Sequence, residues 1–135
     1  MSLKIPNVGE LVILDQLRGA WGNTLILHLY QNNYSPVDGS VIGSFTEATF
    51  SGYATQTCAS WSAAATVSGR ASTSATARTF TNSTGSVGNS IYGYYVTDGS
   101  GNLMWAEADP SAPVGMNNPG DSYTVTPTFT FATEF

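Results

Sequence analysis

The chain has 135 residues, which is long enough for one hydrophobic core and too short for two domains. Only 10% of its residues are charged, against about a quarter in an average soluble domain, and 16 Ser and 17 Thr residues take their place. Since Thr favours strands and Ser favours turns, this composition indicates an all-β domain. The net charge is −5 and the four basic residues are scattered, which argues against direct binding to nucleic acid.

No segment predicts secretion, a membrane span or thiol chemistry. Residues 1–9 lack the apolar run of a signal peptide, and no window is long and apolar enough to cross a bilayer. We therefore expect synthesis in a cytoplasm and no membrane partner. Cys58 is the only cysteine, so an intrachain disulfide is impossible, and we expect it to be a buried small apolar side chain.

The N-terminal region predicts an extended arm over residues 1–6 and a helix over residues 7–18. Asn7 is a suitable N-cap, and Glu10, three residues later, completes a capping box. Gly19 is a suitable stop signal. Because the helix has few polar positions, we expect it to be buried on more than one side.

Residues 24–30 predict a strand with Leu25, Leu27 and Leu29 on one face and the other side chains, including His28, on the opposite face. A turn-rich region follows at residues 32–39. We expect a short strand near residues 41–42 and another at residues 53–58.

The second half of the chain predicts further strands. Residues 59–84, rich in Ser, Thr and Ala, fit either a flexible linker or edge strands, and their Thr/Ala alternation favours strands. Residues 109–120 predict a long surface loop, and residues 122–131 a strand in which Pro127 marks an edge, a bend or a bulge. We therefore predict an all-β fold for residues 1–135: a β-sandwich over residues 23–132, with jelly-roll topology favoured over an immunoglobulin topology, and one short N-terminal helix.

The most informative segment is residues 89–107, which predicts a β-hairpin around the turn at residues 98–102. If Thr97 pairs with Leu103, Tyr95 lies opposite Trp105, and Val96 lies opposite Met104. Both faces are apolar, so both need cover. We expect a second sheet on one face, and the N-terminal helix or a neighbouring subunit on the other.

The sequence offers no catalytic, metal or cofactor motif. His28, the only histidine, sits between leucines and is expected to be structural. The acids in or beside strands are Glu47, Glu107 and Asp109; because nothing in the sequence brings them together, we expect solvated or hydrogen-bonded acids rather than the acid pair of a glycosidase. The chain lacks metal-binding motifs, so no metal or cofactor is expected.

Aromatic residues allow two interpretations. They could form a sugar-stacking platform, or they could fill the core and a protein interface, which is favoured because they lie among apolar neighbours. The residues concerned are Trp21, Trp61, Tyr92, Tyr94, Tyr95 and Trp105.

Five segments occur in an order that resembles a group of small structural proteins of tailed bacteriophages, encoded among head genes. They are IPNVGE with its leucine-rich helix, LILHLYQNNYSPVDGS, FTEATFSGYA, NSIYGYYVTDGSGNLMWAE and GDSYTVTPTFTF. The resemblance implies a capsid decoration or cement protein, without catalytic residues, that forms oligomers on the major capsid protein. It implies synthesis in the cytoplasm of a bacterial host and a final location on the virion surface.

On this resemblance we expect partners in the major capsid protein and in further copies of this chain, as a dimer or trimer. The first candidate interface is the arm and the start of the helix (Leu3, Ile5, Val8, Leu11 and Val12), and the second is the C-terminal set Phe129, Phe131 and Phe135. The alternative is a tail or fibre adaptor or a glycan-binding receptor module. A small glycoside-active enzyme would require a close acidic pair in a groove.

Overall fold

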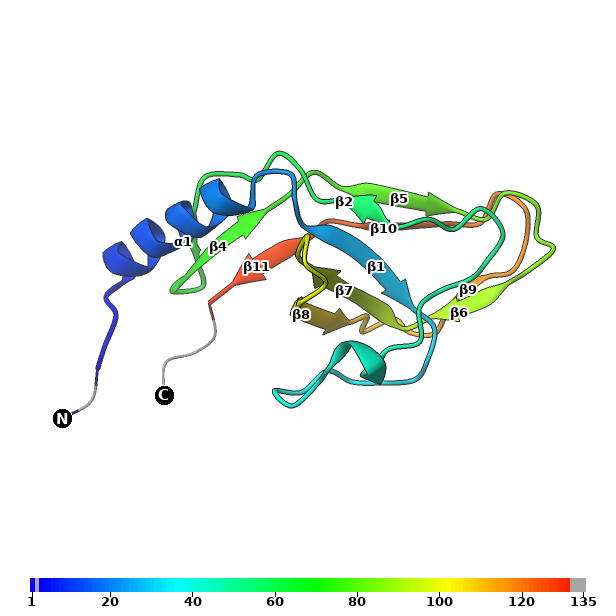
Figure 1. Ribbon diagram of the computed structural model, residues 1–135, viewed down its shortest axis with the longest axis horizontal. Helices are drawn as coiled ribbons and strands as arrows, with labels where there is room; N and C mark the ends of the chain where they lie inside the picture. Colours follow the sequence, from blue (N-terminus) through cyan, green and yellow to red (C-terminus); the bar gives the residue numbers. More distant parts are fainter. Residues whose placement is uncertain (2, 132–135) are drawn as a thin grey trace.

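The computed structural model describes residue 1 and residues 3–131 and shows an all-β fold with one helix at the N-terminus (Figure 1). The elements in chain order are α1 (Asn7–Trp21), β1 (Ile26–Tyr30), the 3₁₀ helix η1 (Ile42–Ser44), β2 (Gln56–Thr57), β3 (Ala65–Val67), β4 (Arg70–Ser74), β5 (Arg78–Thr81), β6 (Asn89–Ile91), β7 (Gly93–Thr97), β8 (Leu103–Ala108), β9 (Val114–Met116), β10 (Ser122–Val125) and β11 (Thr128–Thr130).

The strands pair as antiparallel sheets, which confirms the all-β prediction. The sheet orders are β2-β1-β7-β8, β11-β4-β3, β10-β5 and β6-β9. A jelly roll has eight strands in a double sheet of two Greek keys. These four separate pairings do not establish that connectivity, so the jelly-roll topology stays a prediction.

Helix α1 starts at residue 7 as predicted, but its capping and its C-terminal end differ from the prediction. Its N-cap is Pro6, no side chain caps it, and the predicted Asn7–Glu10 capping box is wrong. The Glu10 carboxylate instead accepts a hydrogen bond from the backbone N–H of Ala71 in β4, at 3.2 Å. The helix continues past Gly19 to Trp21 and ends at Gly22, whose φ of +49° suits glycine and whose N–H donates to the Arg18 carbonyl.

A second carboxylate fastens α1 to the sheet below it. Asp15 accepts hydrogen bonds from the backbone N–H of Ala64 at 3.0 Å and from Nε of Arg18 at 2.5 Å. These hydrogen bonds hold the pKa of Asp15 below its usual value, and the bond from the Ala64 backbone contributes more than the bond from Arg18. Leu14 is fully buried between these contacts, so one face of α1 is fixed against β3 and β4.

The secondary structure confirms one prediction for the rest of the chain and corrects two others. Residues 59–84 hold the strands β3, β4 and β5, as the alternation indicated. The predicted strand near residues 41–42 is wrong, because this region forms the 3₁₀ helix η1. The predicted loop at residues 109–120 contains β9, which pairs with β6.

Pro127 bends the C-terminal strand between two sheets, as predicted. Before it, β10 pairs with β5; after it, β11 pairs with β4. The Pro127 carbonyl accepts a hydrogen bond from Ala75 N–H, which keeps the ribbon joined through the bend. The lack of an N–H on proline explains why the ladder is interrupted there.

The main core lies between the β2-β1-β7-β8 sheet and the strands β4, β5 and β10. Leu25, Leu27 and Leu29 of the predicted strand all enter it, which confirms the predicted alternation of β1. Cys58 is also fully buried there, and burial raises the pKa of its thiol to about 11. A second, smaller cluster on the other face of β7 contains Tyr30, Phe45 and Tyr95.

The β7–β8 hairpin exists, but its register contains a bulge. Thr97 pairs with Leu103 as expected, whereas the next pair joins Val96 to Trp105, and Tyr95 then faces Ala106. The predicted Tyr95–Trp105 and Val96–Met104 pairs are therefore wrong, because one extra residue on β8 shifts its faces.

Both faces of β7 are buried, whereas β8 is partly exposed, and the predicted cover of the second face of β7 is wrong. That face is covered by the segment between β1 and β2, whose Phe45 ring stacks on Tyr95 with the ring centroids 4.8 Å apart. Helix α1 lies against β3 and β4 instead. The prediction failed because it overlooked Phe45, which lies in a segment without a clear period.

Candidate binding groove

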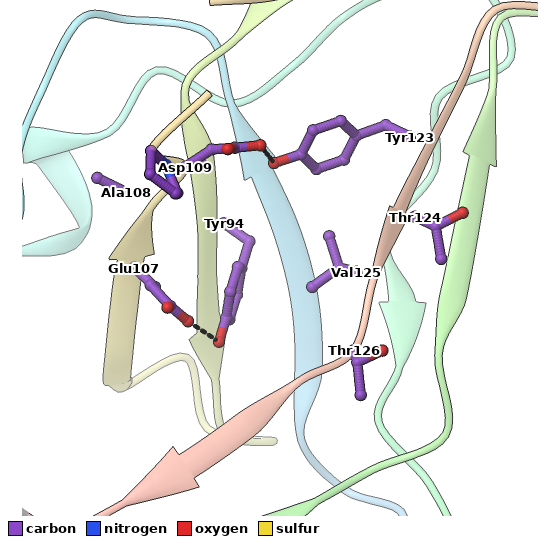
Figure 2. A pocket seen from close by; sticks show the side chains of 10 residues that line it. Tyr94, Glu107, Ala108, Asp109, Tyr123, Thr124, Val125 and Thr126 are labelled. Atoms are coloured by element: carbon purple, nitrogen blue, oxygen red, sulfur yellow. Dashed lines mark hydrogen bonds between the residues drawn. The ribbon is translucent and has the colours of Figure 1, made fainter. Parts of the chain in front are cut away.

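A groove separates the edge strand β8 from β10 and β11, and we define it by two adjoining hollows. The inner hollow, of about 180 Å³, lies between residues 107–110 and residues 123–126 (Figure 2). The outer hollow, of about 300 Å³, lies between residues 105–107 and residues 128–130. Glu107 lines both hollows, so it stands at the middle of the groove.

Glu107 is held by Tyr94, which projects from the neighbouring strand β7. The Tyr94 hydroxyl donates a hydrogen bond to Oε2 of Glu107 at 2.8 Å (Figure 2). Burial, followed by the charge and hydrogen bond of Glu107, raises the pKa of Tyr94, although the Thr128 backbone and the Trp105 side chain oppose this shift. Tyr94 therefore remains a protonated donor at neutral pH.

Asp109 has a similar partner on the opposite wall. The Tyr123 hydroxyl of β10 donates a hydrogen bond to Oδ2 of Asp109 at 2.5 Å (Figure 2), and the Ser111 N–H donates to Oδ1 at 2.7 Å. Burial and the adjacent Asp109 raise the pKa of Tyr123. Each carboxylate of the inner hollow is thus fixed in direction by a tyrosine hydroxyl.

Aromatic rings line the outer hollow. Trp105 and Phe129 are half-buried, and their ring centroids lie 5.2 Å apart. Behind them, Trp105 contacts Trp21 at 5.4 Å and Trp61 at 6.0 Å. The rings that border the groove are therefore packed against further aromatic rings.

The structure changes the interpretation of the three acids singled out in the sequence. Glu107 and Asp109 line one hollow, contrary to the expectation that nothing brings these acids together, whereas Glu47 lies elsewhere. All three are hydrogen-bonded, as expected. Glu107 and Asp109 are two residues apart at the end of β8, and residues i and i+2 of a strand share a face. This spacing is the signal in the sequence that could have placed the two carboxylates together.

His28 lies in a network on the second face of β7. Its Nδ1 is 2.8 Å from Oε1 of Glu47, its Nε2 is 2.8 Å from Oγ1 of Thr97, and its ring stacks on Tyr95 at 4.5 Å. A carboxylate, an imidazole and a hydroxyl in this order resemble a hydrolytic triad. Thr97, however, is only 5% exposed, so its hydroxyl cannot meet a substrate and the network is structural.

The candidate partner residues fall into two groups. Leu3, Ile5, Val8 and Val12 are exposed, with Leu3, Val8 and Val12 at 86%, 73% and 57%. We call these four residues, together with the exposed Ile13, the arm–helix surface. The other candidates, Leu11, Phe129 and Phe131, are half-buried against the main core, and Phe135 lies outside the described residues.

Comparisons with known proteins do not assign the groove or the arm–helix surface. No protein family, characterised protein or solved structure was found to match the chain. Within residues 1 and 3–131, no cluster of three or more His, Cys, Asp or Glu residues could hold a metal ion. Over the same residues, no helix has the length and hydropathy needed to cross a bilayer.

Proposed function

We propose that this protein is a non-enzymatic structural component of a tailed-phage virion, which decorates and stabilises the capsid by binding the lattice of the major capsid protein. The observation that carries the proposal is the arm–helix surface, where five large apolar side chains are exposed on consecutive elements. Contiguous exposed apolar side chains mark a protein interface more often than an ordinary surface.

The attachment of α1 explains why this surface is available to a partner. Glu10, Leu14 and Trp21 point into the protein and are buried. Val8 and Val12 are four residues apart on the opposite face, where no part of the described chain covers them. The helix is thus fixed on one side and presents the other, which limits the ordering cost of binding.

Lattice binding would stabilise the particle by mass action, because a subunit that binds only the assembled lattice opposes its disassembly. The low charge content of the chain favours such close association, since neighbouring copies repel one another weakly. We propose that the subunits are themselves dimers or trimers on the capsid surface.

A tail or fibre adaptor, or a receptor-binding module, is the alternative function. The groove favours it, because aromatic rings and oriented carboxylates lie together there. The copy number in purified particles, measured by quantitative mass spectrometry, separates the two: hundreds of copies indicate the head lattice, and a few copies indicate the tail.

The lattice proposal is tested by binding to purified undecorated capsids in a sedimentation assay. We expect Val8→Ser with Val12→Ser to weaken binding about tenfold or more, since each truncated side chain loses apolar contact area. Val87→Ser, at an exposed valine outside the arm–helix surface, is the matched control and should bind as the original chain does. Deletion of residues 1–6 tests the arm separately. Unchanged affinity in both altered proteins would overturn the proposed role of the arm–helix surface.

A further inference from the structure

We propose that the groove between β8 and β10–β11 binds a neutral oligosaccharide, with sugar hydroxyls on Glu107 and Asp109 and a sugar ring against Trp105 and Phe129. This inference goes beyond lattice binding and does not depend on it, because the groove shares no residue with the arm–helix surface. It rests on the combination of a hollow, two oriented carboxylates and half-buried aromatic rings.

The carboxylates are arranged as acceptors for hydroxyl groups. Tyr94 donates to Oε2 of Glu107, while Oε1 of Glu107 has no hydrogen-bond partner within the described residues. Sugars carry adjacent hydroxyls, and hydrogen bonds from a hydroxyl to a carboxylate are roughly twice as strong as those between neutral groups. Because tyrosine hydroxyls already fix both carboxylates, little ordering is needed when a ligand binds.

The aromatic part of the groove suits the apolar face of a sugar ring. Trp105 and Phe129 are backed by Trp21 and Trp61, so their outward surfaces are held in place. Ligand pockets typically combine such rings with a few placed polar groups. Thr124, Thr126, Thr128 and Thr130 belong to the facing wall, where the hydroxyls of Thr124, Thr128 and Thr130 pair with hydroxyls of β5 and β4.

Charge excludes anionic ligands from this groove. Among the described residues that line the two hollows there are two carboxylates and no Lys or Arg. A phosphate, a nucleic acid or an acidic sugar would therefore meet like charge without a compensating cation. A Ca²⁺ ion normally takes six to eight oxygen ligands, and the tyrosine donors compete for the carboxylate oxygens here.

An inserted polypeptide strand fits less well than a sugar. Strand insertion needs a continuous row of backbone groups along the edge. Pro110 follows β8 on one wall, and Pro127 lies between β10 and β11 on the other. Both prolines lack an N–H, so the two edges cannot offer an unbroken ladder.

The test uses the full chain and four neutral trisaccharides as probes: maltotriose, cellotriose, mannotriose and tri-N-acetylchitotriose. Binding is measured by saturation-transfer NMR and isothermal titration calorimetry. We expect at least one trisaccharide to bind with a saturable isotherm, and we expect Glu107→Gln and Asp109→Asn each to weaken it about tenfold or more. Both amides keep an acceptor for the tyrosine hydroxyl, so the fold is preserved.

Asp98→Asn is the matched control, since Asp98 lies in the hairpin turn outside the groove, and Asn keeps an acceptor for the backbone N–H groups of Ser100 and Asn102. This control should bind the trisaccharide as the original chain does. The Val8→Ser, Val12→Ser protein should also bind it normally, because its substitutions affect only the proposed binding to the capsid. Three results would overturn the inference: no trisaccharide binds; binding persists unchanged in both Glu107→Gln and Asp109→Asn; or Ca²⁺ alone binds and is lost in these variants. An extended peptide that binds with new backbone protection along β8 would assign the groove to strand insertion instead.

Discussion

The two faces of β7 are both buried, but by different chemistry. On one face, Tyr94 and Val96 enter the main core together with Leu27 and Leu29 of β1. On the other, Tyr95 is stacked between His28 and Phe45. The first face packs against the strands β4, β5 and β10 across the main core, and the segment between β1 and β2 covers the second face.

This difference indicates what each face requires of its residues. An apolar core tolerates changes that keep volume, because its contacts have no direction. The second face contains an imidazole with a partner on each nitrogen, and a half-satisfied buried network costs more than an apolar one. Substitutions of equal size should therefore be better tolerated on the first face than on the second.

The largest effect is expected at Gly93, where the second face is most crowded. A methyl group on Gly93 would lie 2.7 Å from the Tyr30 hydroxyl oxygen and would clash with the backbone oxygen of Glu107. Since one of these neighbours is backbone, Gly93→Ala should lower the free energy of unfolding by about 3 kcal/mol, at the upper end of overpacking costs. Urea denaturation measures this change.

Gly99→Ala is the matched control, because a methyl group there meets nothing within 4 Å. Its free energy of unfolding should change by less than about 0.5 kcal/mol. If Gly93→Ala proves equally neutral, the close approach of Tyr30 to β7 is not a constraint, and the contrast between the two faces fails.

A smaller effect is expected from the histidine network. His28→Phe keeps the stack on Tyr95 but leaves the buried Thr97 hydroxyl unpaired, at a cost of about 1–3 kcal/mol. Adding Thr97→Val removes the unpaired hydroxyl, so the double variant should be more stable than the sum of the two single changes predicts. Denaturation of the four proteins forms a double-mutant cycle.

Strictly additive changes in the free energy of unfolding would show that His28 and Thr97 are not coupled. Glu47 does not complicate the comparison, because its side chain is 40% exposed and still accepts a hydrogen bond from Tyr53. When the imidazole is removed, water can therefore replace the hydrogen bond between His28 and the Glu47 carboxylate.

The parts of the fold that the sequence predicted are those set by local pattern. Alternation in residues 24–30 identified β1 and its buried face, the turn at residues 98–102 identified the β7–β8 hairpin, and the missing N–H of Pro127 identified the bend. In each case one or a few neighbouring residues determine the result.

The parts that failed depend on distant partners. Glu10 has the right spacing for a capping box, yet its carboxylate bonds to Ala71, 61 residues away. A bulge on β8 changed the cross-strand pairs without any signal in the residue types. The groove itself forms where β8 meets β10 and β11, and no local pattern shows that Glu107 would lie beside Tyr123.

The smallest effect is expected at high pH and concerns the tyrosines of the second face. Burial, with smaller contributions from Asp109 and Tyr34, raises the pKa of Tyr30 to about 12, and burial with Glu47 raises that of Tyr95 to about 12. Both values lie above the usual 10.0, so the protonated folded state is favoured. The stability these tyrosines contribute is complete below pH 10 and is lost as the pH rises through about 12.

Tyr95→Phe should unfold like the original chain near neutrality, because no described residue hydrogen-bonds the Tyr95 hydroxyl, and should lose less stability between pH 10 and about 12. Denaturation at several pH values tests this, and an identical decline in both proteins would mean that Tyr95 is not shielded by the segment that covers the second face.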